Sequence, residues 1–241
     1  MIRKFLFLVG LILVSCSSDD TGEVPDGDTP EQTGLTEFQL EFIEEYHYVT
    51  FNLSPTSFGG NLNEKWSEEV KIFLDGGADA SYQESVENQI STLNDYMTDG
   101  TTLEVVNALS EANVHLYLGP AVDIENLWPD MFSFLSQGSF QGYALYSSSS
   151  SNINFGRIWV NNDGMPIFTH ELGHVLGFGH ASDARCGQNS SFMCSSLSNG
   201  FSTFDTGMIK TLYHPDITVG KTFQQLRPVI EELLLSESIA L

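Results

Sequence analysis

Residues 170–180 read HELGHVLGFGH, and this stretch says more about the fold and function of the chain than any other. On an α-helix, residues four apart lie on the same face, so His170 and His174 can present two imidazoles to one metal ion. Glu171 directly follows the first of these histidines, where its carboxylate can take a proton from a water bound to the metal. Catalytic zinc usually has three protein ligands and keeps a fourth position for water or substrate, so the pattern requires one more ligand.

His180 is the predicted third ligand. It lies six residues after His174, out of helical register with the first two histidines. Gly177 resolves this, because glycine readily adopts the left-handed conformation that ends a helix, and the chain can then turn back toward the metal. Three histidines can also be structural residues of a buried helix, but the combination of spacing, glycine and third histidine favours a zinc site.

The pattern HExxHxxGxxH is the signature of the metzincin zinc endopeptidases, and the chain resembles matrixin-like and bacterial HEIGH-type members of that family. Residues 191–194 (SFMC) resemble the Met-turn, with Met193 as the methionine beneath the metal. Residues 201–213 are similar to the last helix of the catalytic domain, so the specific resemblance covers residues 155–215. It implies an α+β fold with a twisted mixed β-sheet, an edge strand, a zinc-binding helix, and a mostly irregular and helical C-terminal subdomain.

The resemblance also implies peptide-bond hydrolysis by a water that zinc activates. Zinc bound by His170, His174 and His180 would lower the pKa of its water to about 7, and Glu171 would be the general base. We therefore expect a zinc endopeptidase with one catalytic Zn²⁺ and a protein or peptide substrate. Two alternatives stay open: an exopeptidase or other zinc hydrolase, and a non-catalytic zinc-containing surface lipoprotein that serves in binding or adhesion.

The first residues of the chain resemble a bacterial lipoprotein signal. Arg3 and Lys4 precede a short apolar run, which is typical of a secretory signal and too short to cross a bilayer as a helix. Residues 13–16 (LVSC) resemble a lipobox, in which cleavage exposes a cysteine for lipid attachment. We expect a signal peptide at residues 1–15 and lipidation of Cys16, with an ordinary signal peptide as the alternative.

The segment that follows predicts the location of the protein. Residues 17–20 (SSDD) resemble the acidic export tag of surface lipoproteins in Bacteroidetes-type bacteria. Residues 16–34 contain almost nothing apolar, so we expect a flexible acidic tether. These features predict a lipid-anchored protein of the bacterial outer membrane, exposed at the cell surface if the tag is used.

Length and charge exclude several other functions. The chain has 241 residues and a formal net charge of −23, which is the wrong sign for binding nucleic acid or an anionic membrane surface. We expect no nucleic-acid partner, membrane contact only through the N-terminal lipid, and a monomer. Residues 35–241 are long enough for one sizeable domain, and nothing in the sequence indicates a second.

The three cysteines divide into one lipidation site and one pair. With Cys16 lipidated, Cys186 and Cys194 remain together in an oxidising compartment, so we expect a disulfide between them. The bridge would restrain the loop between the third ligand and Met193, and a closure this short stabilises by about 2 to 3 kcal/mol. Two free thiols are the alternative.

Hydrophobic periodicity predicts the remaining elements. Strands are expected at residues 66–74, 114–118, 143–146 and 157–160, helices at 81–97 and 222–235, and a hairpin loop at 147–151. Pro228 is expected to kink the last helix or to delay its start, and residues 37–46 fit either a short helix or an irregular segment. The resemblance assigns the substrate-binding edge strand to residues 142–147, because a free edge offers unpaired N–H and C=O groups to an extended peptide.

Other polar residues fit no ligand pattern. Asp183 is expected to cap a turn, with a hydrogen bond to a zinc histidine as the alternative. Tyr213 is expected in the core, because the tyrosine that follows the Met-turn in some relatives is replaced by Ser195. Ca²⁺ has no support in the loop spacing of the acidic residues, and the other histidines are expected in structural or surface roles (Asp75, Asp79 and Asp123; His47, His115 and His214).

Overall fold

The structure is a computed structural model, and it describes residues 34–55, 59–188, 191–198 and 200–241. Residues Gly34–Leu241 form one compact unit. The predicted signal peptide, the lipidation site Cys16 and the predicted tether up to residue 33 lie outside the described residues. In the part of the chain that is described, no helix is long and apolar enough to cross a membrane.

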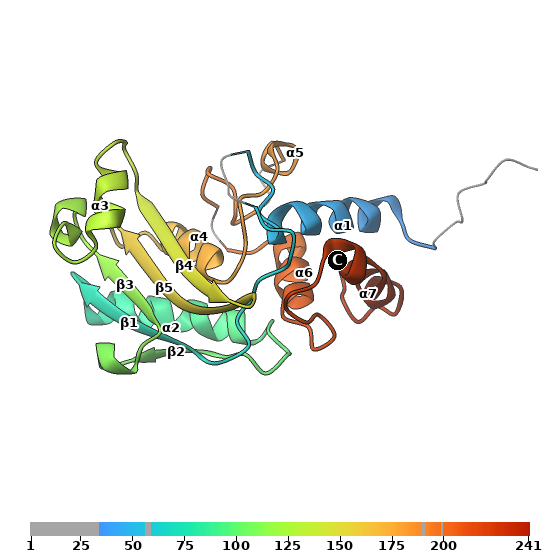
Figure 1. The fold of residues 1–241 in the computed structure, drawn as a ribbon, viewed down its shortest axis with the longest axis horizontal. Helices are drawn as coiled ribbons and strands as arrows, with labels where there is room; N and C mark the ends of the chain where they lie inside the picture. Colours follow the sequence, from blue (N-terminus) through green and yellow to red (C-terminus); the bar gives the residue numbers. More distant parts are fainter. Residues whose placement is uncertain (1–33, 56–58, 189–190, 199) are drawn as a thin grey trace, which may run out of the picture. The chain divides into compact units, whose positions relative to one another are not determined.

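A mixed five-stranded β-sheet forms the centre of this unit (Figure 1). Its strands are β1 Val70–Gly76, β2 Leu103–Val106, β3 Val114–Leu118, β4 Gly142–Ser149 and β5 Asn152–Val160. Their order across the sheet is β2-β1-β3-β5-β4, with parallel pairing throughout except between β4 and β5, which are antiparallel. The strand predicted to contain the substrate-binding edge, β4, does lie at an edge of the sheet.

The described residues also form seven α-helices: α1 Glu37–Thr50, α2 Ala80–Asn94, α3 Pro129–Leu135, α4 Met165–Val175, α5 Asp183–Cys186, α6 Thr203–Leu212 and α7 Phe223–Leu235. Two short 3₁₀ turns, Leu109–Glu111 and Ala121–Ile124, complete the elements. The predicted α+β class is therefore confirmed. Figure 1 shows α2 and α4 lying along the sheet, while α1, α6 and α7 gather beyond its end.

Side-chain alternation along β5 separates two hydrophobic cores. Ile158 and Val160 belong to the main core, which includes Phe168 and Leu172 of α4. Trp159 points to the opposite face and packs in a smaller cluster with residues of α3 and the preceding turn. Because both faces of β5 are covered, the strand that precedes α4 is fixed on both sides, and the start of α4 is fixed with it.

The helix ends follow from their sequences. Thr36 with Gln39 and Ser202 with Asp205 form capping boxes at the starts of α1 and α6. Pro166 lies in the first turn of α4, where a missing N–H costs no hydrogen bond. Residues 37–46, for which a helix and an irregular segment were both open, belong to the helix α1.

Several predicted boundaries are wrong. The strand predicted at 66–74 begins at Val70, because its pairing with β2 begins there; Trp66 lies before the strand, and its indole donates a hydrogen bond to the carbonyl of Val175 at 2.8 Å. The predicted loop at 147–151 is mostly strand, since β4 continues through Ser149 and only two residues, with φ of 51° and 67°, make the turn. Pro228 does not delay α7, which already begins at Phe223.

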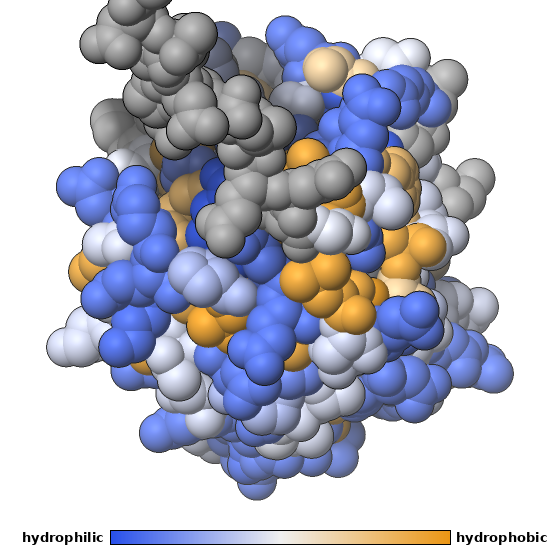
Figure 2. All heavy atoms as spheres, turned by 90° about the vertical axis from the view of Figure 1, so that its right-hand side faces the viewer, coloured by the Kyte–Doolittle hydropathy of each residue, from blue (hydrophilic) through white to orange (hydrophobic). Residues whose placement is uncertain are grey.

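The helices beyond the sheet pack through aromatic contacts. The rings of Phe42 and Phe204 meet edge to face at 5.1 Å, which joins α1 to α6. The Gln39 side chain donates to the carbonyl of Leu234 at 3.2 Å, which joins α1 to α7. The outer face on this side is mostly hydrophilic, with hydrophobic patches among the polar side chains (Figure 2).

Candidate metal centre

Three histidines converge on one point at the end of α4. One nitrogen from each of His170, His174 and His180 lies within 4.8 Å of the others, and no second group of three or more potential ligands exists among the described residues. The Nε2 atoms of His170 and His174 are 3.2 Å apart. Tetrahedral zinc with bonds of about 2.0–2.1 Å places two ligand nitrogens about 3.3 Å from each other. The residues therefore fit a zinc ion.

Backbone carbonyls orient two of the rings. The Nδ1 of His170 lies 2.9 Å from the carbonyl of Phe192, and the Nδ1 of His174 lies 2.8 Å from the carbonyl of Phe178. A carbonyl only accepts, so each Nδ1 must carry the proton and each Nε2 must present a lone pair. Two lone pairs that face each other at 3.2 Å repel, and a cation between them removes that repulsion.

Burial keeps these histidines neutral. It lowers the pKa of His170 to about 4 and the pKa of His174 to about 3, and it also lowers the pKa of His180. The other two rings of the cluster add to the effect at His174, because protonated rings would repel one another. Neutral imidazole is the form that binds metal, so protons do not compete for the site at neutral pH.

The turn after α4 returns His180 to the other two ligands. Gly177 has φ of 97°, and a β-carbon there would lie 2.6 Å from the carbonyl oxygen of Glu64. Both requirements select glycine. Both neighbours of His180 are held by backbone hydrogen bonds. The N–H of Gly179 donates to the carbonyl of Val49 at 2.8 Å, and the N–H of Ala181 donates to the carbonyl of Met193 at 3.0 Å.

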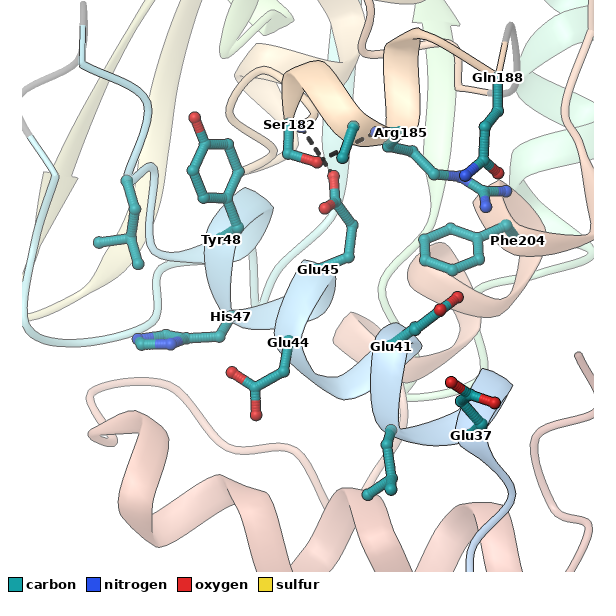
Figure 3. A pocket seen from close by; sticks show the side chains of 13 residues that line it. Glu37, Glu41, Glu44, Glu45, His47, Tyr48, Ser182, Arg185, Gln188 and Phe204 are labelled. Carbon is teal, nitrogen blue, oxygen red and sulfur yellow. Dashed lines mark hydrogen bonds between the residues drawn. The ribbon is translucent and has the colours of Figure 1, made fainter.

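Helix α1 also holds this turn, through a hydrogen bond to the segment that follows His180. The carboxylate of Glu45 accepts a hydrogen bond from the backbone N–H of Ser182 at 2.8 Å (Figure 3). These residues line a groove of about 700 Å³ between α1 and α5, with Arg185 lying over the ring of Phe204. None of the three histidines lines this groove. The groove is linked to the three histidines only through α1, whose Glu45 holds the segment that follows His180.

Glu171 follows His170 in α4 and is buried against the edge strand β4. Its side chain is 7% exposed, and burial raises its pKa to about 8. A cation close by would act in the opposite direction, because it favours the carboxylate form. A β-carbon on Gly142 of β4 would lie 2.6 Å from Oε1 of Glu171, so the carboxylate fits only because that residue is glycine.

The segment around Met193 packs against α4 at Gly173. Met193 is 1% exposed, and Gly173 leaves room for its sulfur, since a β-carbon there would meet that atom and would lie 2.6 Å from the Phe192 ring. Cys186 and Cys194 form a disulfide with 5.5 Å between their Cα atoms. The sulfur of Met193 therefore packs against α4, and the bridge restrains the loop that leads to Met193.

Sequence reasoning missed Asp205 as a supporting residue. Its side chain is 2% exposed, and Oδ2 accepts from the N–H of Phe192 at 3.3 Å and from the N–H of Ser202 at 2.9 Å. The same carboxylate thus caps α6 and holds the residue whose carbonyl orients His170. The spacing of Ser202 and Asp205 predicts the cap, but nothing local predicts the contact with Phe192.

The remaining predicted roles divide clearly. Asp183 is exposed at the start of α5, where Ser182 is the capping residue, so Asp183 neither caps nor contacts a zinc histidine. Tyr213 is fully buried and donates to the carbonyl of Leu176 at 2.8 Å, which confirms its core role. His115 pairs with Asp75 at 3.0 Å, away from any group of metal ligands in the described residues.

Fold and site together define an α+β protein with a three-histidine group able to bind a metal ion. The chain belongs to the family described as "Protein of unknown function (DUF2927)", whose model matches residues 38–232. No curated protein matches the chain. The matched region includes the whole sheet, α4 and the three histidines, so the candidate metal centre lies inside the family's domain.

Proposed function

We propose that this protein is a zinc-dependent endopeptidase of the metzincin type. The observation that carries the proposal is the pair of Nε2 atoms 3.2 Å apart on His170 and His174, with the buried Glu171 directly after His170 in α4. The two nitrogens match the spacing of zinc ligands, and the carboxylate supplies the proton acceptor that hydrolysis needs. A purely structural site would have no use for that acceptor.

Each residue of the site then has a role. Bound zinc would supply an activated water and would polarise the carbonyl of the peptide bond. Glu171 accepts the proton of the attacking water and delivers it to the nitrogen of the leaving amine. Met193 shapes the floor beneath the ligands without binding the metal, since a thioether packs well in an irregular core gap.

The edge strand β4 supplies a binding surface for an extended peptide. Its other side pairs with β5, which leaves one row of its backbone N–H and C=O groups without a neighbouring strand. A substrate that pairs with this row lies alongside Gly142, and thus alongside Glu171, without depending on a particular side chain. This arrangement favours cleavage within a chain over removal of a terminal residue.

The test is hydrolysis of an unfolded protein such as casein, with and without a chelator. We expect internal fragments by mass spectrometry, loss of activity after zinc is removed, and recovery when zinc is returned. Fragments that differ from the substrate by single terminal residues would point to an exopeptidase. Activity that chelation leaves unchanged, or zinc-loaded protein that binds peptides without cleaving them, would overturn the proposal.

A further inference from the structure

A small polar cavity, which we call the Glu64 pocket, adjoins the candidate metal centre at His174. It has a volume of about 150 Å³, and its lining includes Glu64, Tyr146, His174 and Phe178. Sites for small-molecule ligands usually span about 300–1,000 Å³, so this pocket has the size for a single side chain. Because one metal ligand forms part of its wall, anything in the pocket lies close to the proposed cleavage site.

Glu64 is held in place by both of its neighbours. Asn63 is fully buried, and its side chain donates to the carbonyl of Thr218 at 3.0 Å. Lys65 is 4% exposed and pairs with Asp99 at 2.6 Å. Glu64 is only half-buried and lines the pocket. Its carboxylate is therefore presented by a segment that is anchored on both sides, with little conformational freedom left to lose on binding.

The carboxylate of Glu64 has neutral partners. It accepts hydrogen bonds from the hydroxyl of Tyr146 at 2.8 Å and from the hydroxyl of Ser148 at 2.5 Å. Within the described residues it forms no ion pair with a lysine, arginine or histidine. Two carboxylate oxygens offer about four acceptor positions, so capacity remains for a further donor. Among the described residues, the carboxylate of Glu64 therefore lacks a cationic side chain as its partner.

The pocket and the general base lie on the same face of the edge strand. Side chains two or four residues apart in a strand point to the same face, and Gly142 and Tyr146 are four apart. Gly142 lies against Glu171, whereas Tyr146 reaches Glu64. A peptide that pairs with β4 and has its scissile bond beside Glu171 thus passes the Glu64 pocket a few residues away.

We propose that the Glu64 pocket selects substrates with a lysine or arginine at one fixed position on one side of the scissile bond. This inference rests on the proposed endopeptidase function. The long apolar stem of either side chain can pack against Leu62, an exposed residue of the pocket lining, while its cationic head donates to Glu64. A neutral side chain would leave the carboxylate with its two hydroxyl partners and no cationic one, so it binds less well.

The experiment compares the zinc-loaded wild type with Glu64→Gln in two assays. The first is cleavage of a peptide library, in which the wild type should prefer lysine and arginine at one position by roughly tenfold or more, and Glu64→Gln should lose that preference while still cleaving neutral peptides. The second is retention of the uncleaved library by Glu171→Gln, with and without Glu64→Gln, and identification of the bound peptides by mass spectrometry.

Two matched variants test whether the preference depends on the charge of Glu64 itself. Tyr146→Phe removes a hydrogen bond to Glu64 but keeps the charge, so the preference should persist. Glu84→Gln removes an exposed charge on α2, away from the site, and should change nothing. Zinc content and thermal unfolding confirm that each variant is folded and loaded.

The two assays also distinguish failure of this inference from failure of the proposed function. Cleavage without a basic preference, or a preference that survives Glu64→Gln, overturns the role of the pocket and leaves the endopeptidase intact. Retention of basic peptides that depends on Glu64, without any cleavage, supports the pocket and overturns the endopeptidase. Retention with no bias toward basic peptides overturns the pocket in either case.

Discussion

Gly142 and Glu171 are packed so closely that a β-carbon on the first would lie 2.6 Å from the carboxylate oxygen of the second. The same β-carbon would lie 2.6 Å from Cγ2 of Ile167, so the added methyl has no alternative space. The Glu171 side chain can therefore keep its position only because residue 142 of the edge strand has no side chain. This relationship gives a way to displace the base without touching a metal ligand.

We predict that Gly142→Ala lowers the turnover number much more than it lowers zinc affinity. The methyl group must push Glu171 away from its position, and a misplacement of about 1 Å can reduce the rate by about 100-fold. The measurement is casein hydrolysis together with zinc content in the same sample. An alanine at Gly77, where a β-carbon would have 3.6 Å to its nearest neighbour, is the control and should retain activity. Full activity in Gly142→Ala would mean that Glu171 does not depend on this fit.

We predict that Gly177→Ala weakens zinc binding as well as folding. The alanine would have to adopt φ near 97° and would meet the carbonyl of Glu64 at 2.6 Å, so the turn that carries His180 must shift. The matched control is Gly100→Ala, where φ is 94° and nothing lies within 4 Å. The control isolates the cost of the backbone conformation, about 1–2 kcal/mol. Equal losses of zinc affinity in the two variants would contradict the role assigned to the turn.

The two buried histidines predict a specific pH dependence. Their pKa values of about 4 and about 3 in the folded chain lie below the usual 6.5, so the unfolded chain binds more protons in between. Their contribution to stability is therefore fully present above pH 6.5 and is lost as the pH falls toward 4 and then 3. The stabilisation by zinc should shrink over the same range, because protons compete for the same nitrogens.

This dependence can be measured by thermal unfolding from pH 8 to pH 4, with zinc and with a chelator. Glu171 acts in the opposite sense, since its raised pKa of about 8 gives stability that is present below 4.5 and lost as the pH rises through 8. The series is therefore best run in Glu171→Gln, with and without His170→Gln and His174→Gln. If the histidine substitutions leave the pH profile unchanged, the rings are not buried as neutral ligands.

The disulfide should matter for stability more than for chemistry. Replacing Cys186 and Cys194 together by serine removes a bridge over a sequence separation of 8, which stabilises a folded chain by about 2 to 3 kcal/mol. We expect a lower free energy of unfolding in denaturant titration, with zinc still bound at saturating concentration. The bridge joins the end of α5 to the residue after Met193. If the variant failed to bind zinc even at saturating concentration, the disulfide would also be needed to position the histidines.

The three-histidine group could be predicted because its arrangement is local. Two histidines on one helical face and a glycine turn need only short-range geometry, and the structure brings His170, His174 and His180 together. The edge strand was placed by the family resemblance and by the order of the elements ahead of α4, and β4 does lie at an edge of the sheet. The α+β class followed from the same resemblance, with which the expected order of the elements agreed.

The supporting contacts could not be predicted because they join distant parts of the chain. Glu64 contacts Tyr146 across 82 residues, and Glu45 contacts Ser182 across 137. No periodicity in the sequence pairs such positions. Short elements were missed for another reason: β2 has four residues and α3 has seven, too few to give a clear hydrophobic pattern.

The most direct test of the central claim is casein hydrolysis by Glu171→Gln, with zinc counted in the same sample. Three histidine ligands are intact in this variant, and the proton acceptor is gone. The account predicts about one zinc per chain in both proteins, with hydrolysis by the wild type and a loss of at least about 100-fold in the variant. Hydrolysis by Glu171→Gln at the rate of the wild type, with zinc bound, would contradict it.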